Sequence, residues 1–128
     1  MSQTIKLTRG DTLRLKFQRH DFNCGIITDE PHAIFFTVKR SFADDEFVFQ
    51  ITKDAMTYEE DTKDWHFVIL PETTESLEYG EYVFDLEIIQ NEEKTEAGKY
   101  KNKTTVQKGT LVIENESTWA VNEGGNNE

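Results

Sequence analysis

The sequence predicts an all-β domain, folded as a two-sheet antiparallel sandwich of about seven strands with one short helical turn near residues 72–77. Apolar and polar residues alternate with a period of two along most of the chain, which is typical of strands that have one buried and one hydrated face. Turn-forming clusters separate these runs roughly every 8–15 residues, as they do in sandwiches. The 128 residues, 12% of them aromatic, suffice for one hydrophobic core.

Seven segments carry this alternation. In residues 12–19, Leu13 and Leu15 share one face with other apolar residues, while Arg14 and Lys16 share the opposite face. The same pattern predicts strands at residues 4–8, 33–40, 47–53, 65–70, 81–89 and 108–114. The polar stretch 91–103 is expected to form a hairpin loop whose arms extend the flanking strands.

The inward rows of these strands define the expected core, because the buried face of each sheet must be covered by the other sheet. Phe47 is expected to point inward at the start of its strand. The expected core members are Leu13, Leu15, Phe17, Ile34, Phe36, Val38, Phe49, Ile51, Phe67, Ile69, Leu77, Tyr82, Phe84, Leu86, Leu111 and Ile113.

Residues 70–82 are expected to form the crossover between the two sheets. Pro71 has no backbone N–H and cannot donate to a ladder, so the chain leaves the sheet there. Acidic side chains then favour the N-terminal end of a helical turn. Gly80 is expected to reverse the chain, and Tyr82 to open the next inward row.

The domain is expected to span residues 1–114, followed by an acidic, Asn- and Gly-rich flexible tail at 115–128. The tail contains Trp119, and large aromatic side chains dominate the energetics of protein interfaces. Trp119 is therefore the first candidate for a residue that contacts a partner.

The net charge of −11 is distributed unevenly. Residues 1–20 hold five of the 14 basic residues but only one of the 25 acidic residues, which makes Arg9, Arg14 and Lys16 further candidate contacts. Two interpretations stay open: the basic strand pairs with an acidic strand of its own sheet, or it meets an acidic partner such as a second copy. The negative charge of the whole argues against binding to nucleic acid or to an anionic membrane.

The first residues are polar and charged, so no signal peptide is expected, and no apolar run approaches the roughly 20 residues of a membrane helix. The single cysteine, Cys24, rules out an internal disulfide and fits a reducing compartment.

No motif predicts catalysis, a metal or a cofactor. The three histidines, His20, His32 and His66, match no ligand spacing. The acidic turns at 44–46 and 59–61 lack the alternate-residue spacing of an EF-hand loop. We therefore expect no enzymatic activity, no cofactor and no bound metal.

A carbohydrate-binding or surface-adhesion module is the alternative function. Sugars stack on aromatic rings, and Tyr58, Tyr79, Tyr82 and Tyr100 are candidates for such a face. Tyr82 is expected to serve the core instead.

Four segments occur in a recognisable order: "IKLTRGDTLRLKFQ", "AIFFTVKRSFADDEFVFQIT", "WHFVILPETTESLEYGEYVFDLEI" and "KGTLVIENESTW". This succession, over roughly residues 4–118, resembles the immunoglobulin-like β-sandwich domains of tailed-phage and prophage structural proteins, and is similar to the N-terminal domain of baseplate upper proteins. The matching positions are Gly10, Asp11, Thr12, Phe36, Val38, Lys39, Leu70, Thr74, Leu77, Gly80, Tyr82, Asp85, Gly109 and Val112.

The resemblance implies an immunoglobulin-like sandwich that serves as a non-enzymatic component of a tail or baseplate. Its implied partners are other virion proteins or copies of itself, in a homo-oligomer within the assembled particle. It further implies assembly in the bacterial cytoplasm and a location in the virion. Tyr82 is expected to act as the tyrosine corner of such sandwiches, with its hydroxyl bonded back to the backbone of the preceding turn.

Overall fold

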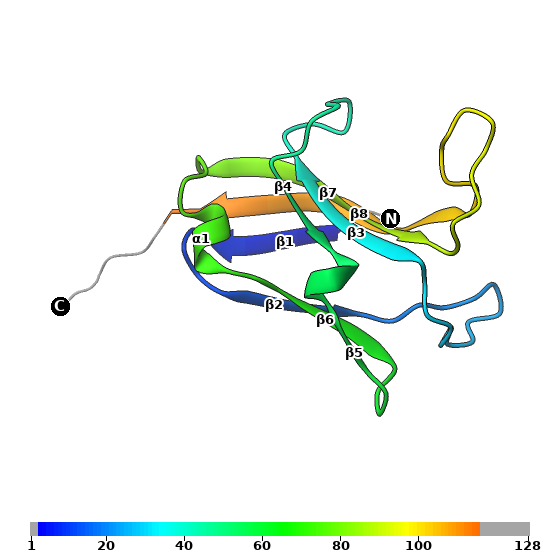
Figure 1. Cartoon of the computed structure of the whole chain (residues 1–128). Coiled ribbons are helices and arrows are strands. Elements are labelled where there is room, and N and C mark those ends of the chain that lie inside the picture. Colours follow the sequence, from blue (N-terminus) through cyan, green and yellow to red (C-terminus); the bar gives the residue numbers. More distant parts are fainter. Residues whose placement is uncertain (1–2, 116–128) are drawn as a thin grey trace.

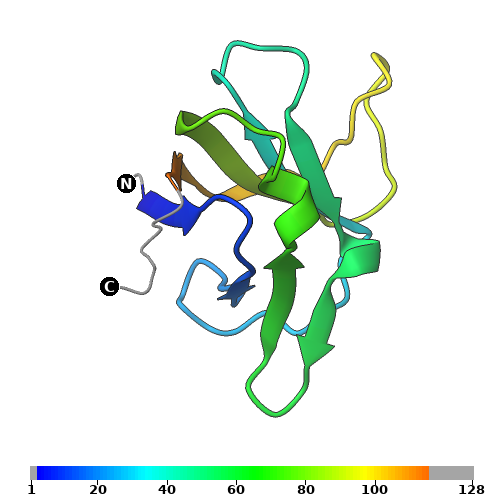
Figure 2. The same ribbon diagram turned by 90° about the vertical axis from the view of Figure 1, so that its left-hand side faces the viewer.

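The computed structural model describes residues 3–115, which fold into two β-sheets packed face to face (Figures 1 and 2). The elements are β1 (Gln3–Thr8), β2 (Leu13–Phe17), β3 (Ala33–Lys39), β4 (Phe49–Thr52), the 3₁₀ turn η1 (Lys53–Ala55), β5 (Thr57–Glu59), β6 (Asp64–Ile69), α1 (Pro71–Thr74), β7 (Gly80–Ile89) and β8 (Lys103–Glu114). One sheet has the strand order β1-β8-β7-β3-β4 and the other β2-β6-β5. The predicted all-β sandwich is confirmed.

The strand order is that of an immunoglobulin-type sandwich. In the usual lettering, β2-β6-β5 corresponds to strands B-E-D, and β8-β7-β3-β4 corresponds to G-F-C-C′. The first strand departs from the B-E-D sheet, because β1 pairs with β8 in the larger sheet. As a result, β6 is the only strand that pairs with β2 within residues 3–115.

The eight strands agree with the expected number of about seven, and the additional strand is β5, whose three residues are too few to show alternation. Three details of the prediction need correction. β1 runs parallel to β8, so the sandwich is not wholly antiparallel. The helical turn begins at Pro71 and ends at Thr74. Phe47 precedes β4 and is 52% exposed, so it does not point inward.

The core is built around phenylalanines from both sheets. The ring of Phe36 lies 4.9 Å from that of Phe67 and 5.5 Å from that of Phe84, measured between centroids. Phe84 follows Tyr82 by two residues, the position that a disulfide cysteine takes in antibody domains. Packed aromatic rings thus join the two sheets where antibody domains use a disulfide and a tryptophan.

Most of the expected core is buried. The exceptions are half-buried side chains packed against the core, namely Leu13, Leu15, Phe49, Ile51 and Leu77. Leu7, Met56 and Thr74 are also buried, although they were not among the expected members.

The predicted hairpin between the last two strands is confirmed. β8 begins at Lys103, five residues before the expected start, and Lys94 pairs with Tyr100 in the loop. This hairpin and the loop between β2 and β3 lie at one end of the sandwich, and α1 lies at the other (Figure 1).

Candidate functional site

Two of the candidate contact residues lie together on β2. Arg14 and Lys16 are exposed on the outer face of the three-stranded sheet, and their cross-strand neighbours on β6 are Val68 and His66. Neither basic side chain forms an ion pair with another residue of the described chain. The interpretation that the basic strand pairs with an acidic strand of its own sheet is therefore wrong.

The opposite edge of the same sheet is acidic. Glu59 ends β5, and Glu60 and Asp61 follow in the turn to β6, all three exposed. Glu59 Oε1 lies 3.0 Å from His66 Nε2, close enough for charge attraction when the histidine is protonated, although the contact lacks hydrogen-bond geometry. We call Arg14 and Lys16 the basic edge, and Glu59, Glu60 and Asp61 the acidic edge.

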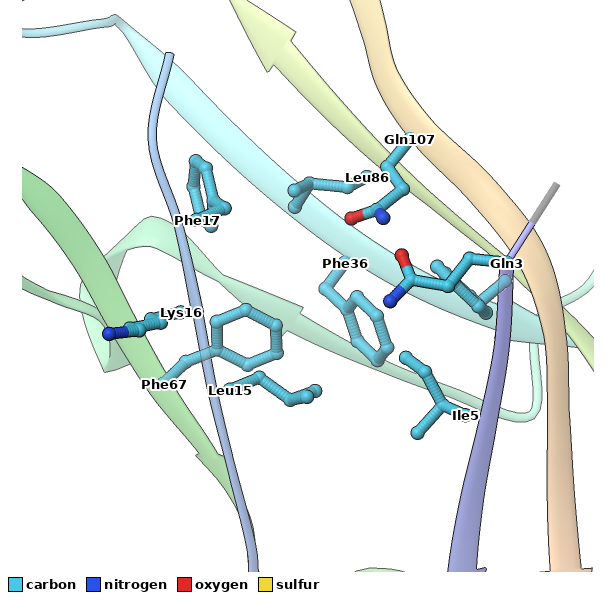
Figure 3. Close-up of a pocket in the computed structure, with 10 residues that line it drawn as sticks. Gln3, Ile5, Leu15, Lys16, Phe17, Phe36, Phe67, Leu86 and Gln107 are labelled. Carbon is cyan, nitrogen blue, oxygen red and sulfur yellow. The ribbon is translucent and has the colours of Figure 1, made fainter. Parts of the chain in front are cut away.

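A crevice of about 60 Å³ opens between β1 and β2, and we call it the lateral crevice (Figure 3). Half-buried Ile5 and Leu15 lie on its two sides, and the rings of Phe36 and Phe67 line it more deeply. It exists because β1 has joined the other sheet, so no strand within residues 3–115 covers the outer side of β2. Apolar surface of the core is thus accessible beside the basic edge.

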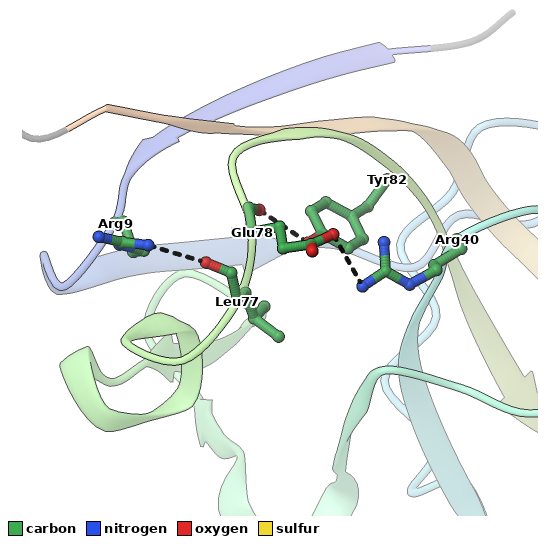
Figure 4. Close-up of polar contacts among 5 residues, drawn as sticks. All are labelled: Arg9, Arg40, Leu77, Glu78 and Tyr82. Atoms are coloured by element: carbon green, nitrogen blue, oxygen red, sulfur yellow. Dashed lines mark hydrogen bonds and ion pairs between the residues drawn. The ribbon is translucent and has the colours of Figure 1, made fainter.

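Arg9 lies apart from the other two candidates, at the corner between β6 and β7 (Figure 4). Its Nη1 donates a hydrogen bond to the carbonyl of Leu77 at 3.1 Å, and its guanidinium lies 4.2 Å from the centre of the Tyr79 ring. The N–H of Gly10 donates to Thr74 Oγ1 at 3.0 Å. Arg9 therefore fastens the turn after β1 to the corner, whereas Arg14 and Lys16 face solvent.

The implied tyrosine corner is present. The hydroxyl of Tyr82 donates a hydrogen bond to the carbonyl of Glu78 at 2.7 Å (Figure 4). Arg40 Nη2 lies 3.6 Å from Glu78 Oε1, but both side chains are largely exposed. Since exposed ion pairs contribute about 0–1 kcal/mol, the buried tyrosine is the more important fastening.

Trp119, the fourth candidate contact, lies outside the described residues. Its contribution to binding stays a prediction.

A larger cavity of about 390 Å³ lies near the end of β2, beside β7 and β8. Arg19 lines it and is only 4% exposed. Its Nη1 donates to the carbonyl of Asp29, and its Nη2 donates to Gln90 Oε1 at 2.6 Å. Burial lowers the pKa of Arg19, which Asp29 partly offsets. The sequence did not predict this role, in which a cation ties the β2–β3 loop to the end of β7.

A row of charges crosses the outer face of the five-stranded sheet. Burial raises the pKa of Asp85, and the neighbouring Glu87 raises it further, while nearby lysines oppose the change. Lys103 Nζ lies 3.5 Å from Glu87 Oε2. Asp85 stands opposite Lys108, so charges of opposite sign face each other across β7 and β8 as a result of the register of these strands.

The residues considered for metal binding or carbohydrate binding do not come together at one place in the fold. Residues 3–115 contain no group of three or more His, Cys, Asp or Glu side chains that could hold a metal. Tyr58 packs on Trp65, whereas Tyr100, in the loop between β7 and β8, packs on His32. Tyr79 lies beneath Arg9, so the described tyrosines do not share one face. None of the described helices has the length and apolar character that crossing a bilayer requires.

No protein-family model matches the chain, and no curated protein matches its sequence.

Proposed function

We propose that this chain is a non-enzymatic structural module of a phage or prophage tail or baseplate, and that it acts through protein–protein contacts. The observation that carries the proposal is the open edge at β2. There, Arg14 and Lys16 have no acidic partner among the described residues, and the lateral crevice exposes apolar surface beside them.

Open sheet edges favour contacts with other proteins. The outward N–H and C=O groups of an edge strand are a template on which a neighbouring chain can add a strand. Basic side chains beside such an edge select an acidic neighbour and disfavour a basic one. The inward positions of the strands are occupied by packed side chains such as Phe36 and Phe84, so the chemistry available to a partner lies at the surface.

The residues that carry the resemblance to phage domains also support the proposal, because several of them build one local structure. Gly10 donates its N–H to Thr74, Leu77 accepts from Arg9, and Tyr82 bonds back to Glu78. These positions therefore have a shared physical role at the corner.

The test is to ask whether the chain is part of a particle. Phage particles induced from the host are purified on a density gradient, and peptides are quantified by mass spectrometry. We expect peptides of this chain to follow those of the tail proteins at a constant ratio across the gradient. Their recovery only among slowly sedimenting soluble proteins would contradict the proposal.

A matched pair of variants sharpens the test. Arg14→Glu with Lys16→Glu reverses the basic edge, and it is expected to reduce incorporation into particles without changing the thermal midpoint. Lys99→Glu with Lys101→Glu makes the same change of charge on the exposed hairpin loop, and it is expected to leave incorporation unchanged.

The carbohydrate-binding alternative makes a different prediction. It requires several exposed aromatic rings on one face, whereas Tyr58, Tyr79 and Tyr100 lie on separate elements. A glycan-array signal that is abolished by Tyr79→Ala would support that alternative over the structural role.

A further inference from the structure

We propose that the three-stranded sheet continues from one copy of the chain into the next, with β2 of one copy pairing beside β5 of a second copy. This head-to-tail contact rests on the proposed function, in that it names one of the protein contacts through which the module would act. The two edges of the sheet, their charges and the lateral crevice support this contact.

Both strands involved are edges. The sheet order β2-β6-β5 leaves the outer sides of β2 and β5 without a partner strand among residues 3–115. β2 has five residues and β5 has three, so a shared ladder would be short. A short ladder favours a weak contact that forms at high concentration or within an assembly.

The two edges carry opposite charges on the same face of the sheet. Lys16 stands opposite His66, and His66 stands opposite Thr57 of β5, so these three side chains share the outer face. Glu59, two residues after Thr57, belongs to that face as well, because side chains alternate along a strand. In the continued sheet, the acidic edge of one copy would therefore lie beside the basic edge of the next. Opposite charges on adjacent strands stabilise pairing.

The inner face is also complementary. Tyr58 pairs with Trp65 across the ladder and faces the interior with it. In the continued sheet, Tyr58 of a second copy would lie on the same face as Leu15, which borders the lateral crevice (Figure 3). The contact would thus cover apolar surface that β2 leaves accessible.

The charges of the two edges also favour a head-to-tail contact over a symmetric one. Pairing β2 with β2 would bring Arg14 and Lys16 against their own copies, and pairing β5 with β5 would bring Glu59 against Glu59. Like charges on facing strands destabilise pairing, so both symmetric contacts are disfavoured. A head-to-tail contact is heterologous and builds a ring or an open filament rather than a closed two-fold dimer.

The experiment uses two reciprocal variants of the full chain. Arg14→Glu with Lys16→Glu makes both edges acidic, and Glu59→Lys with Glu60→Lys and Asp61→Lys makes both edges basic. Sedimentation velocity is recorded for the wild type, each variant and the equimolar mixture of the two variants, at concentrations up to about 1 mM, where contacts with a Kd of about 1 mM are detected. Circular dichroism confirms that each variant is folded.

We expect concentration-dependent association of the wild type, at least about a tenfold weaker association of each variant alone, and recovery in the mixture. The variant Lys99→Glu with Lys101→Glu, altered on the hairpin loop, keeps both edges and should associate as the wild type does. In the associated wild type, amides of residues 13–17 and 57–59 should exchange more slowly with deuterium.

A wild-type chain that stays monomeric throughout, or that associates equally well after reversal of the basic edge, would overturn this inference. If such a chain is nevertheless incorporated into particles, the proposed function stands and only the contact is wrong. If the edges associate as described but the chain is absent from particles, the contact stands and the proposed function is wrong.

Discussion

The hydroxyl of Tyr82 donates a hydrogen bond to the carbonyl of Glu78, with the two oxygens 2.7 Å apart. This bond spans four residues and closes the corner through which the chain passes from one sheet to the other. The tyrosine is 2% exposed, so its hydroxyl would otherwise be buried without a partner. The corner holds α1 and Leu77 against the core and receives Arg9 from the first turn.

Replacing Tyr82 with phenylalanine removes the corner hydrogen bond but keeps the ring. We expect a loss of about 1 kcal/mol of folding free energy, the usual net contribution of one hydrogen bond. Tyr79→Phe is the matched control, since Tyr79 is 44% exposed and uses its ring rather than its hydroxyl to contact Arg9. Chemical denaturation measures both changes, and equal effects of the two substitutions would contradict the assigned role of the Tyr82 hydroxyl.

Truncating Phe84 to alanine tests the core. The ring of Phe84 is 2% exposed and packs on Phe36, so its removal should cost about 3–5 kcal/mol. Phe22→Ala makes the same substitution at a side chain that is 99% exposed, and it should leave stability unchanged. A thermal midpoint that Phe84→Ala does not lower would refute the assignment of the core.

Gly109 allows β1 to lie close to β8. A Cβ atom at Gly109 would overlap the backbone carbonyl of Gln3, its partner in the parallel ladder. Gly109→Ala is therefore expected to displace the start of β1 while the rest of the sandwich stays folded. Deuterium exchange should accelerate at the amides of β1 and change little in β3 and β7. Thr110→Ala, one residue along the same strand, is the control, and exchange in β1 that is equal in the two variants would argue against this close approach.

The raised pKa of Asp85 makes the stability of the fold depend on pH. Burial raises its pKa in the folded chain, so the folded state keeps the Asp85 proton to a higher pH than the unfolded state does. The contribution of Asp85 to stability is then lost as the pH rises from the ordinary aspartate pKa of about 4 through the raised value. Asp85→Asn removes this titration, so its stability relative to the wild type should increase between about pH 3 and pH 7. Denaturation curves at the two pH values measure this, and a constant or decreasing difference would contradict the sign.

The alternation of apolar and polar residues was enough to predict seven of the eight strands and the sandwich, because burial of one face imposes a period of two. It could not predict that β1 runs parallel to β8, since alternation marks the buried face of a strand but not its partner or direction. β5 was missed because three residues contain too little alternation, and the residues after them read as an acidic turn.

The candidate site was predicted only in part. Arg14 and Lys16 were identified from their charge, but their lack of acidic neighbours depends on the register between β2 and β6. Arg9 resembled them in sequence, yet contacts with Leu77 and Tyr79 give it a role in the corner. Arg19 was not singled out, because its partner Gln90 is 71 residues away and charged side chains are usually exposed.

Immunogold electron microscopy of purified particles tests whether the chain is a structural part of a phage particle. Antibodies raised against residues 3–115 are applied to intact particles and to particles whose tails have been separated from their heads. We expect gold particles at the tail or its baseplate, present on separated tails and missing from heads. Particles that carry no gold, from a host in which the chain is abundant and the antibody detects it, would show that the chain is not a structural part of the particle.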